Sequence, residues 1–334
     1  MTRRAARNGM PAFVKPQLAT LVDAPPEGED WIYETKFDGY RALAGIGGGR
    51  VTIRTRSGLD WTDKFASLVA PLGALPCRSA LLDGEIAVRT DGRTDFSALQ
   101  NALSTGAGRL IYCLFDLLHL DGEDLTREPL RDRKALLKAL LSKRKDRALD
   151  RALVYSVHRS GGGEAAFRKA CKDGLEGIIA KRAGDPYRST RSLSWLKVKC
   201  GLEQEFVIIG WEPSDKATRP FSSILLAVRE HGRLRYSGRV GTGFSDLRLD
   251  DLAALFARHA RDSAPAPDIP RPIARNAHFI APVLVAEIAF RGWTANGLVR
   301  QGSFRGLRGD KPARAVVRER PKPTAAVTRR KKRQ

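Results

Sequence analysis

Residues 34–41 read Glu-Thr-Lys-Phe-Asp-Gly-Tyr-Arg, and they follow a short apolar run at residues 31–33 that predicts a β-strand. Gly39 lets the backbone turn tightly where this strand ends. Lys36 fits two interpretations: a nucleophile held in a cleft, or a solvated turn lysine paired with Glu34 or Asp38. A nucleophilic lysine needs help, because at its ordinary pKa of ~10.4 about one molecule in a thousand is neutral near pH 7.4. Burial and nearby cations lower that pKa, so the remaining chain should supply cations, a metal site and a phosphate-binding surface.

The composition indicates a two-domain protein with an anionic partner. The chain has 334 residues, of which 42% are hydrophobic, so it can bury a substantial core. Lys and Arg number 59 against 37 Asp and Glu, a net charge of +22. No apolar stretch approaches the ~18–20 residues of a membrane-spanning helix. The charge excess therefore favours nucleic acid as the partner, with no membrane contact.

The four cysteines, Cys77, Cys113, Cys171 and Cys200, form no Cys-x-x-Cys pair. That spacing argues against a zinc site and against a disulfide framework, and it fits a reducing compartment. Residues 1–10 are basic but lack the apolar core of a secretory signal peptide. We therefore expect a cytoplasmic protein, associated with the nucleoid through its charge.

The segments after the octet predict a β-hairpin, since residues 41–44 and 51–53 are strand-like and three glycines lie between them. Strand alternation then places Arg54 and Arg56 on one face, which suits either phosphate contacts or a solvated basic strand.

Residues 81–88 form an apolar strand that contains two acids. Such acids cost free energy unless they are paired, exposed or bound to metal. Glu85 is therefore the first candidate for a metal ligand. The alternative is a hairpin turn at Asp83 and Gly84.

Further strands carry further candidates. Phe115, within an apolar run at 110–118, is either a core residue or a platform for base stacking. A long amphipathic helix is expected at residues 130–149. In the strand at 175–182, Glu176 and Lys181 are five residues apart and so lie on opposite faces unless a bulge intervenes. In the strand at 195–199, both lysines, at 197 and 199, share one face, which suits an anionic cleft.

The composition changes after residue 199. Strands are expected at 205–211, 223–229, 233–240 and 283–290, with a helix at 246–259 and a connector rich in Pro, Ala and Arg at 262–277. This arrangement fits a small closed β-barrel. Residues 329–333 are a run of five basic residues that we expect to be disordered and to bind phosphates.

Several stretches in order resemble the motifs of the ATP-dependent DNA ligases. Residues 36–41 resemble the signature Lys-x-Asp-Gly-x-Arg, and residues 54–57, 83–85, 114–116, 176–181 and 195–199 resemble the later motifs. Residues 304–311 resemble the motif that ends the family's oligonucleotide-binding (OB) barrel. The wording of residues 56–62 and 304–311 is closest to the ligase domain of bacterial end-joining ligase D. One departure is the Gln-Gly pair at 301–302, where His-Pro is expected.

The resemblance implies an α+β fold with two domains. An ATP-grasp-like adenylation (nucleotidyltransferase) domain of antiparallel sheets and helices occupies residues 10–200, and an OB-fold β-barrel occupies residues 201–318. A basic disordered tail is expected at 319–334.

The resemblance also implies the chemistry of the site. Lys36 would attack ATP, Mg²⁺ or Mn²⁺ would be held by Glu85 and Glu176, and AMP would pass from the lysine to a DNA 5′-phosphate. Lys181, Lys197 and Lys199 would surround the α-phosphate and lower the pKa of Lys36. The ligands of ATP would be Glu34 and Phe115 at the adenine, Arg41 and Arg56 at the ribose and phosphates, and Arg305, Arg308 and Lys311 from the barrel.

Two other functions are compatible with parts of the sequence. An RNA ligase or a GTP-using capping enzyme shares the lysine–nucleotide chemistry, and a non-catalytic DNA-binding protein would use the charge alone. The wording of the motifs favours a monomeric DNA ligase that acts on nicked or broken duplex DNA, with an end-binding repair protein as a partner.

Overall fold

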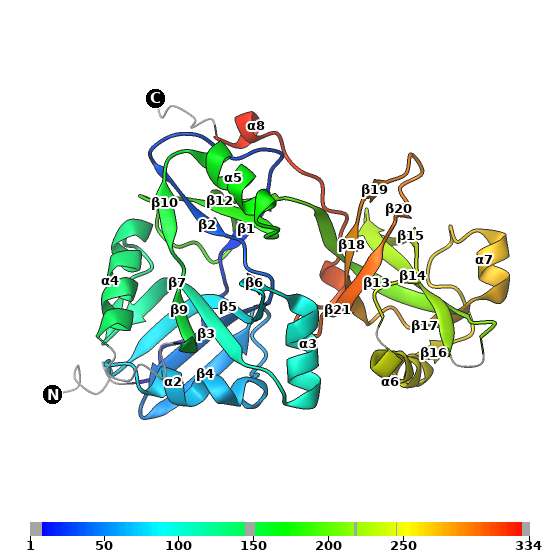
Figure 1. Cartoon of the computed structure of the whole chain (residues 1–334), viewed down its shortest axis with the longest axis horizontal. Coiled ribbons are helices and arrows are strands. Elements are labelled where there is room, and N and C mark those ends of the chain that lie inside the picture. The colour runs from blue at the N-terminus through cyan, green and yellow to red at the C-terminus, as the bar shows by residue number, and fades with distance from the viewer. Residues whose placement is uncertain (1–8, 144–150, 217–218, 245, 329–334) are drawn as a thin grey trace. The chain divides into compact units, whose positions relative to one another are not determined.

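The chain folds into two units, as the computed structural model of residues 9–143, 151–216, 219–244 and 246–328 shows (Figure 1). Unit 1 comprises residues 1–200 and 320–334, and unit 2 comprises residues 201–319. Each unit has a hydrophobic core of its own. The two-domain α+β architecture predicted from the sequence is confirmed.

The first sheet of unit 1 has five strands, in the spatial order β1-β12-β11-β2-β10. Its strands are β1 (Leu18–Leu21), β2 (Trp31–Thr35), β10 (His158–Ser160), β11 (Gly177–Arg182) and β12 (Arg191–Lys199). All neighbours are antiparallel except β1 and β12. The outer face packs against helix α5 (Gly163–Lys172) through a cluster that includes Trp31, Tyr33 and Leu196.

The second sheet of unit 1 has the strand order β4-β3-β5-β7-β8. Its main strands are β3 (Tyr40–Gly47), β4 (Arg50–Thr55), β5 (Ala80–Thr90), β7 (Leu110–Leu120) and β8 (Glu123–Asp124), with β6 (Arg93–Thr94) and β9 (Leu153–Tyr155) added at its edges. Strands β3 and β4 form the predicted hairpin. The largest core of unit 1 covers one face of this sheet. Smaller clusters, one around Leu43 and Phe115 and another around Cys113, pack against its other face.

Helices complete unit 1. They are η1 (Asp63–Leu68), α2 (Val69–Gly73), α3 (Phe96–Thr105), α4 (Leu130–Ser142), α5 and α8 (Thr324–Thr328). The Asp95 carboxylate accepts a hydrogen bond from the Ala98 N–H and so caps α3. Helix α4 packs along β7 and β9. The final part of the helix expected at 130–149 lies outside the described residues.

Unit 2 is a curled sheet in which β13 pairs on both sides, with β14 and with β17 and β18. Its elements are β13 (Leu202–Pro213), β14 (Phe221–Glu230), β15 (Arg233–Val240), α6 (Asp246–Arg258), β16 (Ala260–Arg261), α7 (Arg271–Asn276), β17 (His278–Ile280), β18 (Val285–Phe290), β19 (Gly292–Trp293), β20 (Val299–Arg300), β21 (Ser303–Leu307) and η3 (Ala313–Ala315). The pairing of β13 with β14 shifts register after Ile208. Such a bulge bends the strand, so β13 can belong to both halves of the curl.

Two expectations from the sequence are wrong. The segment expected as a disordered tail instead returns to unit 1, where Lys322 bridges to Val22 and Val327 packs into the cluster beneath α5. The basic run at 329–333 lies outside the described residues. Cys171 and Cys200 form a disulfide across a separation of 29 residues, because the turn after α5 brings Cys171 beside the end of β12.

Among the described residues, no helix is long and apolar enough to span a membrane.

Candidate active site

One face of the five-stranded sheet gathers the predicted cations. Three cross-strand rows carry them: Lys36–Gly177–Lys199, Glu34–Ile179–Lys197 and Ile32–Lys181–Trp195. Because residues at i and i+2 of a strand share a face, the side chains of all three rows point the same way. The backbone N–H of Lys36 donates to the Gly177 carbonyl over 3.0 Å, which extends the sheet by one row beyond β2.

Gly177 resolves the question that strand alternation left open. Its φ of +151° lies in a region that side chains rarely adopt, and a Cβ there would collide with the Val198 carbonyl oxygen. This irregular residue separates Glu176 from the regular strand that carries Lys181. Both acidic and basic side chains therefore reach the same face, although they are five residues apart.

The predicted nucleophile forms a short ion pair. The Lys36 Nζ lies 2.5 Å from Glu176 Oε1, and the two side chains are 19% and 12% exposed. Burial acts to lower the pKa of Lys36, but the Glu176 carboxylate overcomes it, and the pKa is raised despite the opposing charge of Lys199. Lys199 lowers this pKa, as expected of a neighbouring lysine, but the Glu176 carboxylate outweighs it.

The opposite wall of the site comes from β3 and β5. The Arg41 guanidinium binds both carboxylate oxygens of Asp83, at 2.5 and 2.6 Å. The Tyr187 hydroxyl donates to the same carboxylate over 2.7 Å. Asp83 and Gly84 lie in the middle of β5, so the hairpin turn considered for them does not exist. Glu85 pairs in register with Arg41 and contributes to the raised pKa of Lys36.

The donor set can accommodate a divalent cation. The Glu176 Oε2 atom is buried and has no hydrogen-bond partner among the described residues. No group of three acidic, histidine or cysteine side chains suited to a metal occurs in the described part of the chain. A cation held by Glu85 and Glu176 would therefore complete its shell with water and phosphate oxygens, as Mg²⁺ commonly does.

A buried cluster of charges lies beside Phe115. Glu34 is 3% exposed, and its carboxylate contacts the Lys181 ammonium at 2.8 Å and the Lys134 ammonium at 2.7 Å. The Lys181 ammonium also lies 4.1 Å from the centre of the Phe115 ring, over which the Arg41 guanidinium is placed at 4.4 Å. Burial, reinforced by Lys134, lowers the pKa of Lys181 to about 8 against the attraction of Glu34. Lys181 thus forms its ion pair with Glu34.

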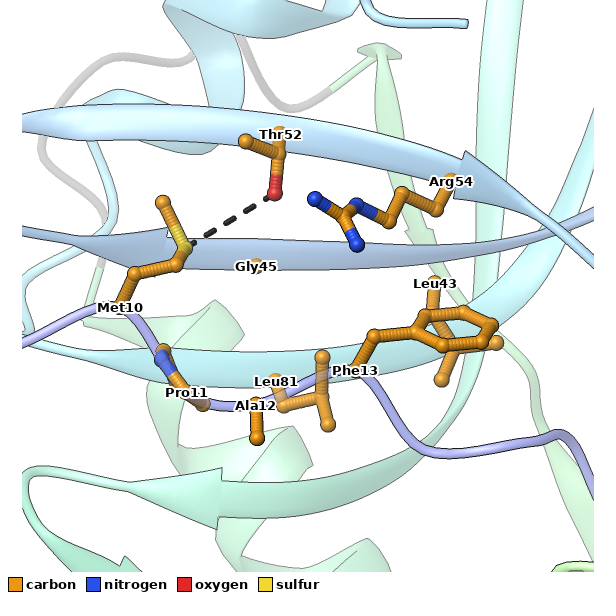
Figure 2. Close-up of a pocket in the computed structure, with 9 residues that line it drawn as sticks. All are labelled: Met10, Pro11, Ala12, Phe13, Leu43, Gly45, Thr52, Arg54 and Leu81. Carbon is orange, nitrogen blue, oxygen red and sulfur yellow. Dashed lines mark hydrogen bonds between the residues drawn. The ribbon is translucent and has the colours of Figure 1, made fainter. Parts of the chain in front are cut away.

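A cavity of about 190 Å³ lies on the same sheet as Arg41, where residues 10–13 run beside β3 and over β5 (Figure 2). Arg54 lines this cavity beside Phe13, with its guanidinium 5.9 Å from the ring centre. Leu43, next to Arg41 on the same face of β3, lines it as well. Arg56 continues the row of Arg41, since its N–H donates to the Arg41 carbonyl over 3.1 Å.

The predicted phosphate ligands of unit 2 each face an acid. Arg308 contacts Asp310 at 2.9 Å and Glu287 at 3.5 Å, and its side chain is 10% exposed. The Lys311 Nζ lies 2.9 Å from Glu205 Oε2. Arg305 is half exposed and lies 4.0 Å from Glu203. Arg308 is therefore part of the packing of the barrel, whereas Arg305 is accessible.

Four charged residues of the site were not predicted from the sequence. Asp83 was interpreted as a turn residue, and the buried Arg133–Asp116 pair, at 2.8 Å, and Lys134 were not singled out. One signal was available for Lys134. It lies at helical spacing from Leu130, Leu137 and Leu141, so it occupies the buried stripe of α4, where a charge needs a partner.

Comparison with known proteins confirms the resemblance seen in the motifs. A family model described as "ATP dependent DNA ligase domain" matches residues 16–199, and another, "ATP dependent DNA ligase C terminal region", matches residues 217–311. The multifunctional non-homologous end joining protein LigD of Pseudomonas aeruginosa is 41% identical over an alignment of 333 positions, which covers 95% of this chain and 39% of that protein.

LigD of Mycobacterium bovis is 37% identical over 310 residues, or 91% of this chain and 40% of that protein. The structure of a mycobacterial DNA ligase D complexed with ATP and MES superposes with a TM-score of 0.69 at 35% identity, covering 92% of this chain and 98% of that chain. The chain thus spans less than half the length of the curated relatives it matches. It belongs to the ATP-dependent DNA ligase family.

Proposed function

We propose that this chain seals breaks in duplex DNA that carry a 3′-hydroxyl and a 5′-phosphate, using ATP, in repair by non-homologous end joining. The observation that supports this most directly is the Lys36–Glu176 pair at 2.5 Å, set in sheet rows that also carry Lys197 and Lys199. A partly exposed lysine among cations and two acids is suited to attack a phosphorus atom. A solvated turn lysine would have neither the burial nor the neighbours.

The reaction proceeds in three transfers. Lys36 Nζ bonds to the α-phosphorus of ATP and pyrophosphate leaves. The DNA 5′-phosphate then takes AMP from the lysine, and the 3′-hydroxyl displaces AMP as the strand is sealed. The proton that Glu176 stabilises on Lys36 must leave before the nitrogen lone pair can react. Preorganised cations carry much of the rate enhancement, because every transfer moves negative charge at phosphorus.

The nucleotide ligands are assigned along the sheet rows. Lys197 and Lys199 would contact the α-phosphate, because their rows include or adjoin Lys36. Arg41 and Arg56 would bind the ribose and phosphates. Glu34 and Phe115 would contact adenine. Lys181, which pairs with Glu34, then belongs to the nucleobase end of the site and not to the phosphate end.

The metal is assigned to Glu85 and Glu176. Mg²⁺ or Mn²⁺ bound there would neutralise charge on the phosphates. The Glu176 carboxylate would hold the metal through Oε2, the oxygen that does not contact Lys36, and a cation there would weaken the attraction that raises the pKa of Lys36. Metal and lysine would thus share one carboxylate.

Unit 2 is proposed to act in the first transfer and then to move. Arg305 and Lys311 would orient pyrophosphate opposite Lys36, with Arg308 holding their loop. The later transfers need DNA in that place, so we assign a hinge to residues 199–202. We further propose that the protein is a monomer that acts on DNA in the cytoplasm and is delivered to breaks by an end-binding protein.

The test is incubation with α-labelled ATP or GTP and Mg²⁺, followed by a denaturing gel and a chase with nicked duplex. Covalent label from ATP that is lost as nicks are sealed is the expected result. Label from GTP alone would identify a capping enzyme, and transfer only to RNA ends an RNA ligase. No covalent label from either nucleotide would leave a DNA-binding protein and overturn the proposal.

A further inference from the structure

The Lys134 ammonium is a buried group to which the proposed reaction gives no role. The side chain is 1% exposed and reaches from α4 to three oxygen acceptors. They are the Glu34 Oε1 atom at 2.7 Å, the Ser156 carbonyl at 3.0 Å and the Phe115 carbonyl at 3.5 Å. An ion pair with Glu34 and hydrogen bonds to the two carbonyls therefore fix the position of this ammonium.

These contacts join the two sheets of unit 1. Glu34 lies on β2 of the five-stranded sheet, and Phe115 lies on β7 of the other sheet. Glu34 and Phe115 are also the two residues assigned to adenine, one to its hydrogen-bonding edge and one to its ring. A single buried ammonium therefore contacts the carboxylate of Glu34 and the main-chain carbonyl of Phe115. The other carboxylate oxygen of Glu34 accepts from Lys181 at 2.8 Å and from the Ser156 hydroxyl at 3.1 Å.

The charges around Glu34 do not balance, because one carboxylate faces the ammonium groups of Lys134 and Lys181. The nearby Asp116 is bound by Arg133 through both of its oxygens at 2.8 Å, although its charge still favours the charged form of Lys181. His158 on β10 and the Arg41 guanidinium over Phe115 add no negative charge. Lys134 thus disfavours the charged form of Lys181, while Glu34 favours it.

We propose that Lys134 is a positioning residue for selection of the nucleobase: it fixes the carboxylate of Glu34 relative to the ring of Phe115 without touching the nucleotide. The inference rests on the proposed function, in which these two residues contact adenine. Adenine presents an amino group that can donate a hydrogen bond to the carboxylate. Guanine presents a carbonyl oxygen at the same position, which cannot donate one. A carboxylate held in place discriminates between the two bases, and one that is free to rotate discriminates less.

Two substitutions separate geometry from charge. Lys134→Met keeps the length of the side chain and removes both the contacts and the charge. Lys134→Arg keeps the charge, but its planar fork cannot reproduce three contacts from one nitrogen. Lys138→Met, an exposed change on the same helix, is the matched control. Each variant is assayed for covalent labelling by ATP and by GTP between pH 6 and 9, and its melting temperature is measured.

For Lys134→Met we expect the KM for ATP to rise by roughly 10- to 100-fold and the preference for ATP over GTP to fall. The limb of the labelling-versus-pH profile that reports the protonation of Lys181 should move to higher pH, because Lys134 no longer disfavours the charged form of Lys181. For Lys134→Arg the preference should fall while the limb stays in place, which keeps a test if the methionine variant does not fold. Wild-type preference in a folded Lys134→Arg or Lys134→Met protein would overturn the inference. Absence of labelling in the wild type would instead overturn the proposed function.

Discussion

At the scale of single residues, Glu176 favours the ammonium form of the proposed nucleophile, Lys36. Glu176 lies 2.5 Å from the Lys36 Nζ atom, and an ammonium has no lone pair with which to attack phosphorus. In the proposed reaction, Lys36 must therefore lose a proton before it attacks ATP.

Substitution of Lys36 should abolish covalent labelling. Lys36→Ala removes the nucleophile, and Lys36→Arg replaces it with a guanidinium that stays protonated. Labelling with α-labelled ATP measures the effect, and Lys169→Ala, an exposed change on α5, serves as the control. Wild-type labelling of the alanine variant would remove the whole proposal.

Loss of either proposed metal ligand should slow sealing by at least ~10²-fold, the size expected for one electrostatic stabiliser. The variants are Glu85→Ala and Glu176→Ala, assayed across a Mg²⁺ titration. Glu164→Ala, which removes an exposed acid on α5, should seal at the wild-type rate. If the Glu85 and Glu176 variants match it at every Mg²⁺ concentration, the two acids are structural.

The buried Lys181 should make stability depend on pH. Its pKa is about 8 in the folded protein against an ordinary value of 10.5. Between these values the unfolded chain binds more protons than the folded one, so the free energy of unfolding should rise with pH, by up to ~1.4 kcal/mol per unit. Urea unfolding of the wild type and of Lys181→Met, compared at pH 8 and pH 10, isolates this contribution. A difference that is constant over this window would contradict the lowered pKa.

At the scale of strands and helices, residue pattern was a good guide wherever the backbone is regular. Alternation placed Lys197 and Lys199 on one face, and the β3–β4 hairpin follows from its glycines and strand-like flanks. The pattern was misleading at Asp83, because a buried carboxylate is tolerated in mid-strand only through partners distant in sequence, here Arg41 and Tyr187, which lie 42 and 104 residues away. Lys134 was missed for the same reason, since its partners are distant in sequence.

The disulfide escaped prediction because the two cysteines lie in different types of element. Spacing alone does not show that the turn after α5 brings Cys171 to Cys200 at the end of β12. The disulfide also removes the support that cysteine spacing gives to a reducing compartment, because disulfides are rare there. It leaves Cys77 and Cys113 as free thiols.

Reduction of this disulfide should destabilise unit 1. For a separation of 29 residues, the loss of loop-closure entropy in the unfolded chain is worth roughly 3–4 kcal/mol. Urea unfolding with and without dithiothreitol measures the effect. Cys200→Ser should match the reduced protein and should not respond to reductant, whereas Cys77→Ser should behave as the wild type. Equal stability of oxidised and reduced wild type would show that the bond does not form in solution.

At the scale of the whole molecule, the proposed movement of unit 2 should separate the reaction steps. The double change Arg305→Ala with Lys311→Ala should lose most covalent labelling by ATP but still seal a nick that already carries AMP. Arg308 is unsuitable for this test, because its removal would leave Glu287 and Asp310 unpaired in the barrel. Both assays use one preparation, with Arg233→Ala, an exposed change on β15, as the control. Normal labelling with failed sealing would assign these cations to DNA and not to pyrophosphate.

The return of the chain to unit 1 has a mechanical consequence. Unit 2 is inserted between residues 200 and 320, so both of its ends are anchored in the same folded body. The returning segment is held by the hydrogen bond from Lys322 N–H to the Leu21 carbonyl and by Thr324, whose hydroxyl binds the Asp23 carboxylate. Tension applied between residue 10 and residue 328 would first load these contacts beside β1. The barrel would carry force only after this segment had detached from unit 1. Until then the applied force would not act on the barrel.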